Sequence, residues 1–567
     1  MRSPFRVRFG IFEADLAARE LLRRGERVEL QQQPFQVLVA LLERPGELVA
    51  RAELQDRIWP GDTRIDAERG INKAINRLRQ ALGDSAEKPS FIETLPRRGY
   101  RFIALVERMI SSIAVLALEN LSGDPTQEYW ADGMTDELVT QITKIKAIKV
   151  ISRTSAMRFK GSVMPLPEVA RQLDVEALLQ GSLVVSAQRI RIRVQLIDAQ
   201  ADRHIWTESY ERELADVLTL QREIAQAIAD KIQAHLVPDS RRVNGVSRVK
   251  PDAFEAYLKG RFFWDKRTEP NLKTAIDYFN RAVLLDPQFA LAQLGLADCH
   301  THLGIIGLAP PHSVIPKAKA AAEAALRFDD TLVEAYATLG HIRTIYDWDW
   351  HRAEQDLTIA IEMNPNCSAA HQYYGILLGI LRRHSEAIEH LKRARDLDPL
   401  SLPGNALLGF IYMRARQYDR AIEACQWAVE LDPSNAFGHW MLSRMLDADE
   451  ELGQALAEAE TAVSLSKGRM PFTAHLGYAQ ARAGDQTRAL EVIDELLNLA
   501  TKQYVSPYLI ATVYVGLDSK DLALEWLERA WADRSPRLNE LNDPPFDGLQ
   551  SDPKFQSLKF RVGFSAD

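Results

Sequence analysis

The sequence predicts a multidomain protein with three regions of different fold class: a small α+β region, a middle α/β region and a C-terminal all-α solenoid. Three observations predict this order. An amphipathic helix over 68–83 runs into a basic hairpin. Strands and helices are expected in mixed order between 112 and 236, with strict alternation of apolar and polar residues over 189–196, and alanines recur every 34 residues from 353 onward. A chain of 567 residues has room for about three or four such domains.

The helix expected over 68–83 has one apolar face and one polar face. Ile71, Ile75, Leu78 and Leu82 recur at helical spacing and form a single buried stripe. No acidic residue interrupts the opposite face. The side chains on or beside that face are of types that hydrogen-bond to base edges or phosphates: Asn72, Lys73, Asn76, Arg77, Arg79 and Gln80.

The residues after this helix predict a β-hairpin with a basic turn. A strand over 91–95 leads into a turn that contains Pro96, Arg97 and Arg98. A major groove about 12 Å wide accepts a helix, and arginines at the tip of a hairpin reach neighbouring phosphates or the minor groove. The two elements together predict a winged helix-turn-helix that binds DNA.

Four short signatures in the first hundred residues appear in the order typical of one family: PFQVLVALLERPGELV, IWPGD, INKAINRLRQALGD and RRGYRF. Short strands precede the first signature, and helices are expected over 34–43 and 52–59. The stretch 5–104 resembles the OmpR/PhoB-type DNA-binding domain, which we place at residues 1–106.

The resemblance assigns positions to the candidate DNA contacts. It implies that Asn72, Lys73, Asn76, Arg77 and Arg79 lie on the groove-facing helix and that Trp59 lies in the loop before it. The wing differs from many relatives, which have an arginine where Pro96 stands here. The sequence therefore leaves open which of the two following arginines, Arg97 or Arg98, enters the groove.

Charge differs in sign between the head and the rest of the chain. Residues 1–105 contain 19 Lys and Arg against 15 Asp and Glu, whereas the remainder contains 51 against 63. This asymmetry suits a nucleic-acid-binding head on an acidic body. A net charge of +4 is small, so we expect weak nonspecific binding at physiological salt.

Alanines mark an internal repeat of 34 residues: Ala353, Ala387, Ala421, Ala455, Ala489 and Ala523. Small residues where two helices cross, with proline after the second helix, resemble the tetratricopeptide repeat. The resemblance covers 252–534 and implies about eight repeats in a solenoid that we place at 252–549, with a concave surface for a protein or peptide. Candidate contacts on that surface, which packing between repeats could also explain, are Phe410, Met413, Phe437, Trp440, Arg444, Tyr478, Arg482 and Tyr508.

The segment 111–237 between these two regions predicts an α/β domain, with a hairpin of two strands expected over 177–186 and 189–198. The phrases SIAVLALENLSGDPTQEYWADGMTDEL and VQLIDAQADRHIWTESYERELADVLTLQREIA resemble the TolB-N-terminal-like or FlgO-like segment that precedes tetratricopeptide repeats in bacterial regulators. A linker over 238–251 and a C-terminal tail over 550–567 complete the expected domain order.

Metal, cofactor and membrane sites are not expected. Cys299, Cys367 and Cys425 are far apart and form no Cys-x-x-Cys pair, and the closest histidine pair, His300 and His302, lacks further ligands at suitable spacing. No apolar run approaches the roughly 20 residues that cross a bilayer. We therefore expect a cytoplasmic protein without a cofactor.

The head and the repeats together favour a bacterial transcription regulator similar to CadC-like and HilA-like regulators, and not an enzyme. Promoter DNA is the expected partner of the head, and a protein or peptide is expected on the repeats. RNA polymerase and a second copy of the chain are further candidates. Two alternatives stay open: a scaffold whose winged helix binds protein, and a nucleotide-cyclase-related signalling protein that lacks its catalytic domain.

Overall fold

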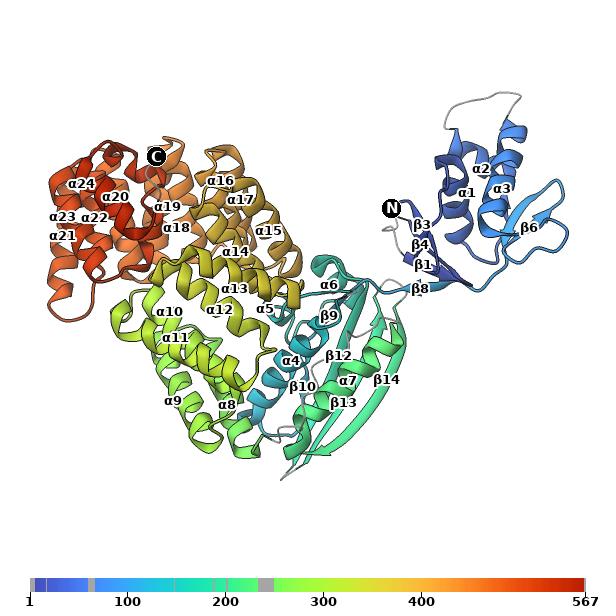
Figure 1. Ribbon diagram of the computed structural model, residues 1–567, viewed down its shortest axis with the longest axis horizontal. Helices are drawn as coiled ribbons and strands as arrows, with labels where there is room; N and C mark the ends of the chain where they lie inside the picture. Colours follow the sequence, from blue (N-terminus) through green and yellow to red (C-terminus); the bar gives the residue numbers. More distant parts are fainter. Residues whose placement is uncertain are drawn as a thin grey trace. The chain divides into compact units, whose positions relative to one another are not determined.

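The computed structural model has the three expected parts, an N-terminal winged helix, a sheet-containing middle region and a helical C-terminal solenoid (Figure 1). The chain divides into two compact units, Met1–Ser111 and Ser112–Asp567. None of the described helices is long and apolar enough to cross a membrane. The structure describes residues 6–16, 18–59, 67–146, 148–186, 189–199, 202–232 and 249–564.

The N-terminal unit combines two small sheets with three helices. The first sheet has the order β4-β3-β2-β1-β8, and the second has the order β5-β7-β6. The elements are β1 (Arg6–Phe9), β2 (Phe12–Asp15), β3 (Glu20–Arg23), β4 (Glu26–Arg27), α1 (Gln32–Leu42), β5 (Val49–Ala50), α2 (Arg51–Ile58), α3 (Ala67–Leu82), β6 (Ile92–Leu95), β7 (Gly99–Phe102) and β8 (Glu107–Met109). The hairpin β6–β7 is the wing, and α3 is the helix expected over 68–83.

The apolar stripe of α3 lies in the core of this unit. Ile71, Ile75, Leu78 and Leu82 are each at most 4% exposed. Burying one such side chain contributes about 1.5–3 kcal/mol, so the stripe fixes which face of α3 points outward. At Gly99 in the wing a Cβ atom would lie 2.0 Å from the backbone oxygen of Val49. Glycine is therefore required where β7 approaches β5.

The middle region is a mixed sheet with the order β11-β9-β12-β13-β14, and β10 pairs with β12. Helices α4 and α7 pack against each other, and α7 also contacts β14. The long strands β12 and β13 end where the sequence pattern placed them. The elements are β9 (Ser112–Val115), β10 (Glu119–Asn120), α4 (Glu128–Thr143), β11 (Lys149–Val150), α5 (Arg153–Met157), α6 (Leu166–Leu173), β12 (Ala177–Ser186), β13 (Arg189–Asp198), β14 (Arg203–Glu213) and α7 (Val217–Lys231).

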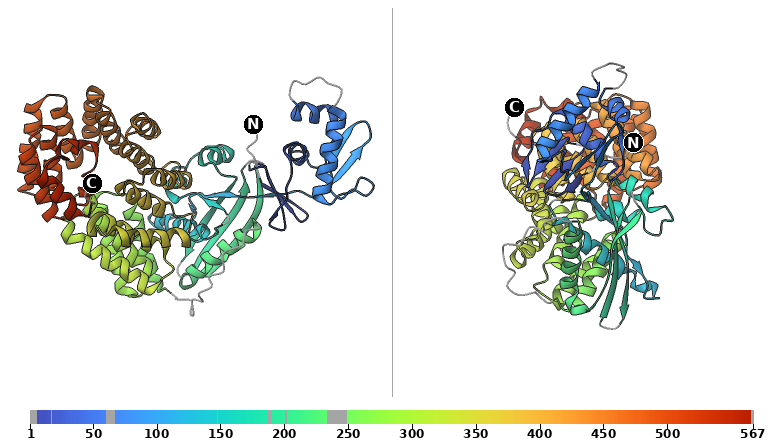
Figure 2. Two further views of the ribbon diagram at one scale, coloured as in Figure 1. Left: turned by 45° about the horizontal axis from the view of Figure 1, so that its top comes forward. Right: turned by 90° about the vertical axis from the view of Figure 1, so that its right-hand side faces the viewer.

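Sixteen helices of the described chain form eight consecutive pairs, and Figure 2 shows them following one another along a curved solenoid from green to red. They are α8 (Pro251–Trp264), α9 (Glu269–Leu285), α10 (Ala290–Ile305), α11 (Pro311–Phe328), α12 (Val333–Ile342), α13 (Trp350–Met363), α14 (Ser368–Ile380), α15 (His384–Leu397), α16 (Leu402–Arg414), α17 (Tyr418–Leu431), α18 (Ala436–Ala448), α19 (Leu452–Ser466), α20 (Met470–Arg482), α21 (Gln486–Ala500), α22 (Pro507–Gly516) and α23 (Lys520–Ala532). Most of the linker expected over 238–251 lies outside the described residues.

The repeated small residues explain how closely the two helices of a pair approach. Ala353, Ala387 and Ala421 are fully buried. A Cβ atom at Gly375 would lie 2.7 Å from Cγ of Leu391 in the partner helix. Larger side chains at these positions would force the helices apart and open the core between repeats.

The C-terminal residues fold back onto the solenoid. Two short 3-10 helices, η4 (Pro536–Glu540) and η5 (Pro544–Leu549), are followed by α24 (Pro553–Val562). The stretch 550–567, expected as a tail, therefore contains a helix, and Phe555 within it is fully buried. Phe555 belongs to the same apolar cluster as Leu541 and Phe546, which closes the end of the solenoid as terminal repeats must.

The middle region and the solenoid are joined by direct packing within one unit. Helix α4 contacts α8, and a Cβ atom at Gly133 would lie only 2.4 Å from the side chain of Leu258. The Ser155 hydroxyl donates to the Asp398 carboxylate at 2.5 Å. The Asn366 amide donates to the carbonyl oxygen of Ile148 at 2.8 Å. These contacts hold α4, α5 and the residues between them against the repeats.

Candidate nucleic-acid interface

The outer face of α3 presents polar side chains that do not pack in the core. Lys73, Asn76, Arg77 and Gln80 are exposed, as their positions opposite the apolar stripe predict. Arg77 donates a hydrogen bond to the side chain of Gln31, which precedes α1. This contact holds the guanidinium along the protein surface. The exposed helix face remains rich in hydrogen-bond donors, and a major groove accepts an α-helix.

Asn72 also lies on α3, but its amide oxygen has partners within the head. It accepts a hydrogen bond from Nη1 of Arg51 at 3.1 Å and from the hydroxyl of Tyr100 at 2.9 Å. The Arg51 guanidinium lies 5.1 Å from the centre of the Tyr100 ring. Asn72 therefore connects α2, α3 and the wing. No local sequence pattern predicts this role of Arg51, because its partners are 21 or more residues away.

Arg79 is buried instead of lying beside the exposed face. Only 7% of it is exposed, and its Nη2 donates to the carbonyl oxygen of Ile92 at 2.8 Å and to the Thr94 hydroxyl at 2.9 Å. The physical reason is the wing, which folds over this side of α3 and offers acceptors that α3 alone does not reveal. Arg79 fixes the distance between the helix and the wing.

Trp59 packs on α3 and does not extend from the loop. Its ring covers Gly70, where an added Cβ atom would lie 2.6 Å from the indole. Trp59 is partly buried against the core of the head. The rest of the IWPGD signature, Pro60 to Asp62, lies outside the described residues.

The turn of the wing presents two exposed arginines, Arg97 and Arg98. The backbone N–H of Arg98 donates to the Leu95 carbonyl oxygen at 3.0 Å, which closes the turn. Arg97 has a φ of 60°, a left-handed conformation that glycine and asparagine adopt readily and other residues rarely. The carbonyl oxygen of Arg98 also accepts from the Arg51 N–H at 3.3 Å. The wing backbone is therefore hydrogen-bonded to α2 as well as within its own turn.

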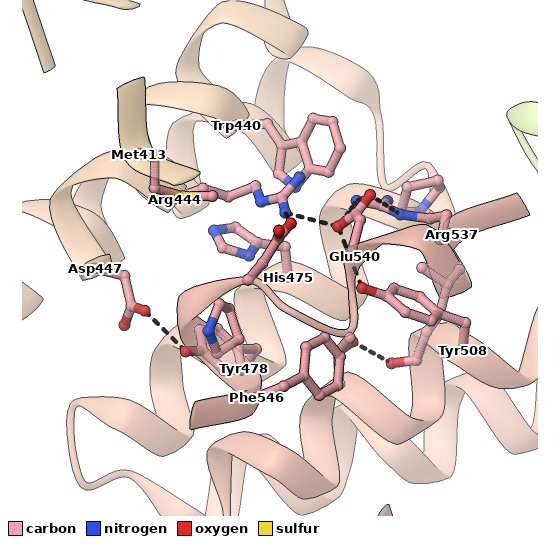
Figure 3. Close-up of a pocket in the computed structure, with 15 residues that line it drawn as sticks. Met413, Trp440, Arg444, Asp447, His475, Tyr478, Tyr508, Arg537, Glu540 and Phe546 are labelled. Atoms are coloured by element: carbon pink, nitrogen blue, oxygen red, sulfur yellow. Dashed lines mark hydrogen bonds and ion pairs between the residues drawn. The ribbon is translucent and has the colours of Figure 1, made fainter. Parts of the chain in front are cut away.

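The second candidate surface, the concave face of the solenoid, is covered by the chain itself. The side chains of Met413, Trp440, Arg444, Tyr478 and Tyr508 surround a cavity of about 40 Å³ together with residues of η4 and η5 (Figure 3). Such a volume holds a water molecule or two and no peptide.

The three remaining concave-face candidates also make contacts within the chain. Phe410 is 7% exposed and lies under the guanidinium of Arg444. Phe437 packs against Trp440 with ring centres 5.5 Å apart and the ring planes tilted by 55°. Arg482 pairs with Asp447 at 3.1 Å. The structure thus places all eight expected partner contacts against residues of the same chain.

Buried charges connect the C-terminal segment to the concave face. Arg444 pairs with Glu540 at 2.7 Å (Figure 3). Arg414 pairs with Asp543 at 2.8 Å. Burial alone would raise the pKa of Glu540, but Arg444 and Arg537 lower it to about 2. These carboxylates neutralise the arginines of the concave face from within the chain.

Comparisons with known proteins agree with the two ends of this architecture. The family model "Transcriptional regulatory protein, C terminal" matches residues 25–102, and the tetratricopeptide repeat model matches residues 349–401 and 407–470. The chain is 24% identical to the transcriptional regulator HilA of Salmonella typhimurium over 392 residues, which are 67% of this chain and 68% of HilA.

Two further similarities are shorter. The chain is 33% identical over 198 residues to the putative adenylate cyclase 3 of Rhizobium meliloti and spans about a third of that relative's length. It is 32% identical to the DNA-binding domain of Klebsiella pneumoniae RstA solved in complex with the RstA box, which covers 17% of this chain and 96% of that domain with a TM-score of 0.16. The chain thus carries an OmpR/PhoB-type DNA-binding domain and tetratricopeptide repeats, and it has transcriptional regulators among its relatives.

Proposed function

We propose that this chain is a bacterial transcription regulator that binds promoter DNA in a sequence-specific manner through its winged helix. The observation that carries the proposal is the exposed face of α3. Its donors and acceptors lie outward, and the packing of the opposite stripe fixes their direction.

Within this proposal α3 lies in the major groove, and its exposed residues read bases. Arg77 has the donor pattern that pairs with guanine, and Asn76 has the pattern that pairs with adenine. Lys73 and Gln80 contact bases or phosphates beside them, and Arg97 and Arg98 place the wing on the backbone or in the minor groove. Phosphate contacts then position the head, while the contacts of α3 provide specificity.

Three of the residues expected to touch DNA have a different role in this proposal. Asn72, Arg79 and Trp59 position α3 and the wing through the contacts described above. They affect DNA binding indirectly, because they hold α3 and the wing in place. Their substitution should disturb the head before it disturbs any single base contact.

We further propose that the middle region and the solenoid receive the regulatory signal. RNA polymerase, another protein and a second copy of the chain are candidate partners. A partner on the concave face would have to compete with the segment 536–549. If two heads bind together, the expected target has half-sites about 34–36 Å apart, or a multiple of that spacing.

We propose that the chain acts without an enzymatic activity of its own. The relationship to transcriptional regulators supports this, because HilA matches along two thirds of both chains. The similarity to the protein called an adenylate cyclase covers only 32% of that protein, so it gives no support for cyclase activity in this chain.

Selection of bound fragments from randomised DNA by the intact protein, at about physiological salt, tests the proposal. The expected result is an enriched motif that a Lys73→Ala/Arg77→Ala variant no longer enriches. An enriched motif that this variant still selects would contradict the assignment to α3. No enrichment by the folded wild type would favour the scaffold alternative, in which the winged helix binds protein.

A further inference from the structure

A second polar site lies where α4 of the middle region faces the first helices of the repeats. A cavity of about 340 Å³ opens between α4 and the helices α8, α10, α12 and α14. This volume is within the range of small-molecule sites, and more than eight times that of the cavity on the concave face. The cavity combines aromatic walls with an unusual number of charged side chains.

Two ion pairs in the cavity wall are complete. Nη2 of Arg261 lies 2.7 Å from the Asp136 carboxylate, and Nε of the same guanidinium donates to that carboxylate at 2.9 Å. Nη1 of Arg153 lies 2.5 Å from the Asp265 carboxylate. These pairs join the middle region to α8 and its following loop, and their charges are balanced.

Among the described residues, three further carboxyl groups in the wall form no ion pair shorter than 3.9 Å. Glu137 is 3% exposed, and one of its oxygens accepts from the Tyr257 hydroxyl at 2.7 Å while the other has no hydrogen-bond partner. Asp298 accepts from the Thr338 hydroxyl at 3.1 Å, and its nearest guanidinium, that of Arg261, is 3.9 Å away.

Glu334 is the third carboxyl group of this set. Within the described chain its carboxylate has only its own backbone N–H as a hydrogen-bond donor and forms no ion pair. Burial raises the pKa of Glu137 to about 7 and that of Asp298 to about 6, and it also raises the pKa of Glu334. The ionised forms of all three are thus destabilised until a positive charge enters the cavity.

One cation at the edge of the cavity, the exposed Arg267, has no counter-ion among the described residues. The guanidinium of Arg267 lies over the Trp264 ring, 3.7 Å from its centre, and makes no hydrogen bond or ion pair with any described residue. His302 lies on the same indole with ring centres 5.5 Å apart. Burial, with help from Arg267, lowers the pKa of His302 to about 3, so this histidine is neutral and Arg267 supplies the positive charge.

We propose that this cavity binds a small zwitterion of the amino-acid type. Its ammonium group lies among Glu137, Asp298 and Glu334, and its carboxylate group pairs with Arg267. The stacked rings of His341 and Tyr373, with centres 4.0 Å apart, form a flat wall for the ligand's side chain. This site extends the proposed function by giving the regulator a chemical signal, but it does not depend on DNA binding.

Other ligand classes fit the same charges less well. A simple amine would leave Arg267 without a counter-ion. A phosphate or dicarboxylate would meet three carboxyl groups and only one unpaired cation. Among the described residues no group of histidine, cysteine or carboxylate side chains has the arrangement of a metal site.

Calorimetry on the full-length protein tests this site with the twenty free amino acids, each measured separately. The expected result is that one or a few bind, and that their methyl esters and N-acetyl derivatives each bind at least about tenfold more weakly because one charge is lost. The proposal is overturned if none of the twenty binds, or if the ester binds as tightly as the amino acid.

Matched variants locate the binding in the cavity. Glu334→Gln and Arg267→Ala should each weaken the bound amino acid by about tenfold or more. Glu389→Gln on α15 and Arg327→Ala on α11 are controls, because both side chains are exposed outside the cavity. Unchanged affinity in Glu334→Gln and Arg267→Ala would overturn the proposal. Thermal unfolding of each variant shows whether it is folded. DNA binding is measured on the same variants, so that a failure of the amino-acid site is distinguished from a failure of the DNA-binding proposal.

Discussion

The recognition helix α3 and the concave face of the solenoid differ in whether their expected contact residues are free. On α3, five of the six candidates are exposed, and Arg79 is the one that is buried. On the concave face, most candidates contact η4 and η5 or one another, and Arg482 pairs with Asp447. Both surfaces have suitable side chains, so residue type alone does not decide whether a surface is available to a partner.

The difference follows from the distance in sequence over which each surface is determined. The exposure of α3 depends on one apolar stripe within 12 residues. The cover of the concave face comes from residues 536–549, which are more than 100 residues from Arg414 and Phe410. Helical periodicity therefore predicts the exposed face of α3, but it contains no information about the cover of the concave face.

The largest effect that sharpens this comparison is expected at Asp543. Asp543→Ala leaves the buried Arg414 without its carboxylate, and both side chains are at most 5% exposed. The free energy of unfolding of the solenoid should fall by about 3–5 kcal/mol in chemical denaturation. The control is Asp547→Ala, since Asp547 and its partner Arg416 are about half exposed and should contribute at most about 1 kcal/mol. Equal losses in the two variants would show that the segment does not cover the concave face as described.

A smaller effect is expected at Arg79 in the head. Arg79→Ala leaves the buried carbonyl oxygen of Ile92 without this donor and should lower the stability of the head by about 1–3 kcal/mol. Arg77→Ala, two residues earlier on the exposed face, should change stability by less than about 0.5 kcal/mol. Thermal unfolding followed through the head measures both. A stable Arg79→Ala head that fails only in DNA binding would return Arg79 to the contact surface.

The pH dependence of stability tests the cavity below α4. The folded pKa of Glu137, about 7, lies above the ordinary value of 4.5, so the folded state holds this proton more tightly. Its stabilising contribution is present below about pH 4.5 and is lost as the pH rises through about 7. In Glu137→Gln, unfolding free energies measured across this window should fall less with rising pH than in the wild type. Parallel curves for the two proteins would contradict the burial of an unpaired Glu137.

The smallest effect is expected from the wing. Replacing Arg97 and Arg98 with alanine should reduce the slope of log K against log salt by about 0.9 for each arginine that lies on a phosphate. Single variants then identify which arginine makes the contact. An unchanged slope in the double variant would place the wing away from the DNA backbone.

Periodicity and repeat spacing predicted the parts of this molecule that depend on local packing. The stripe of α3, the strands β12 and β13 and the alanines of the paired helices all follow from residues that are close in sequence or regularly spaced. The structure thereby confirms the expected classes of the three regions.

The remaining features depend on contacts between distant segments, and no local pattern announces them. Arg79 is buried because the wing folds over it, and Asn72 is held by Tyr100. Glu137 and Asp136 in the middle of α4 have the sequence context of ordinary helix residues. They line a cavity only because α8 and α10 pack opposite them, about 120 residues or more along the chain.

The central claim, that α3 reads DNA through its exposed face, is tested most directly by titrating wild type and Arg77→Ala on the selected motif and on scrambled DNA. The account predicts that the variant loses about 1–3 kcal/mol on the motif, with little change on scrambled DNA. Equal binding of wild type and variant to the motif would contradict it.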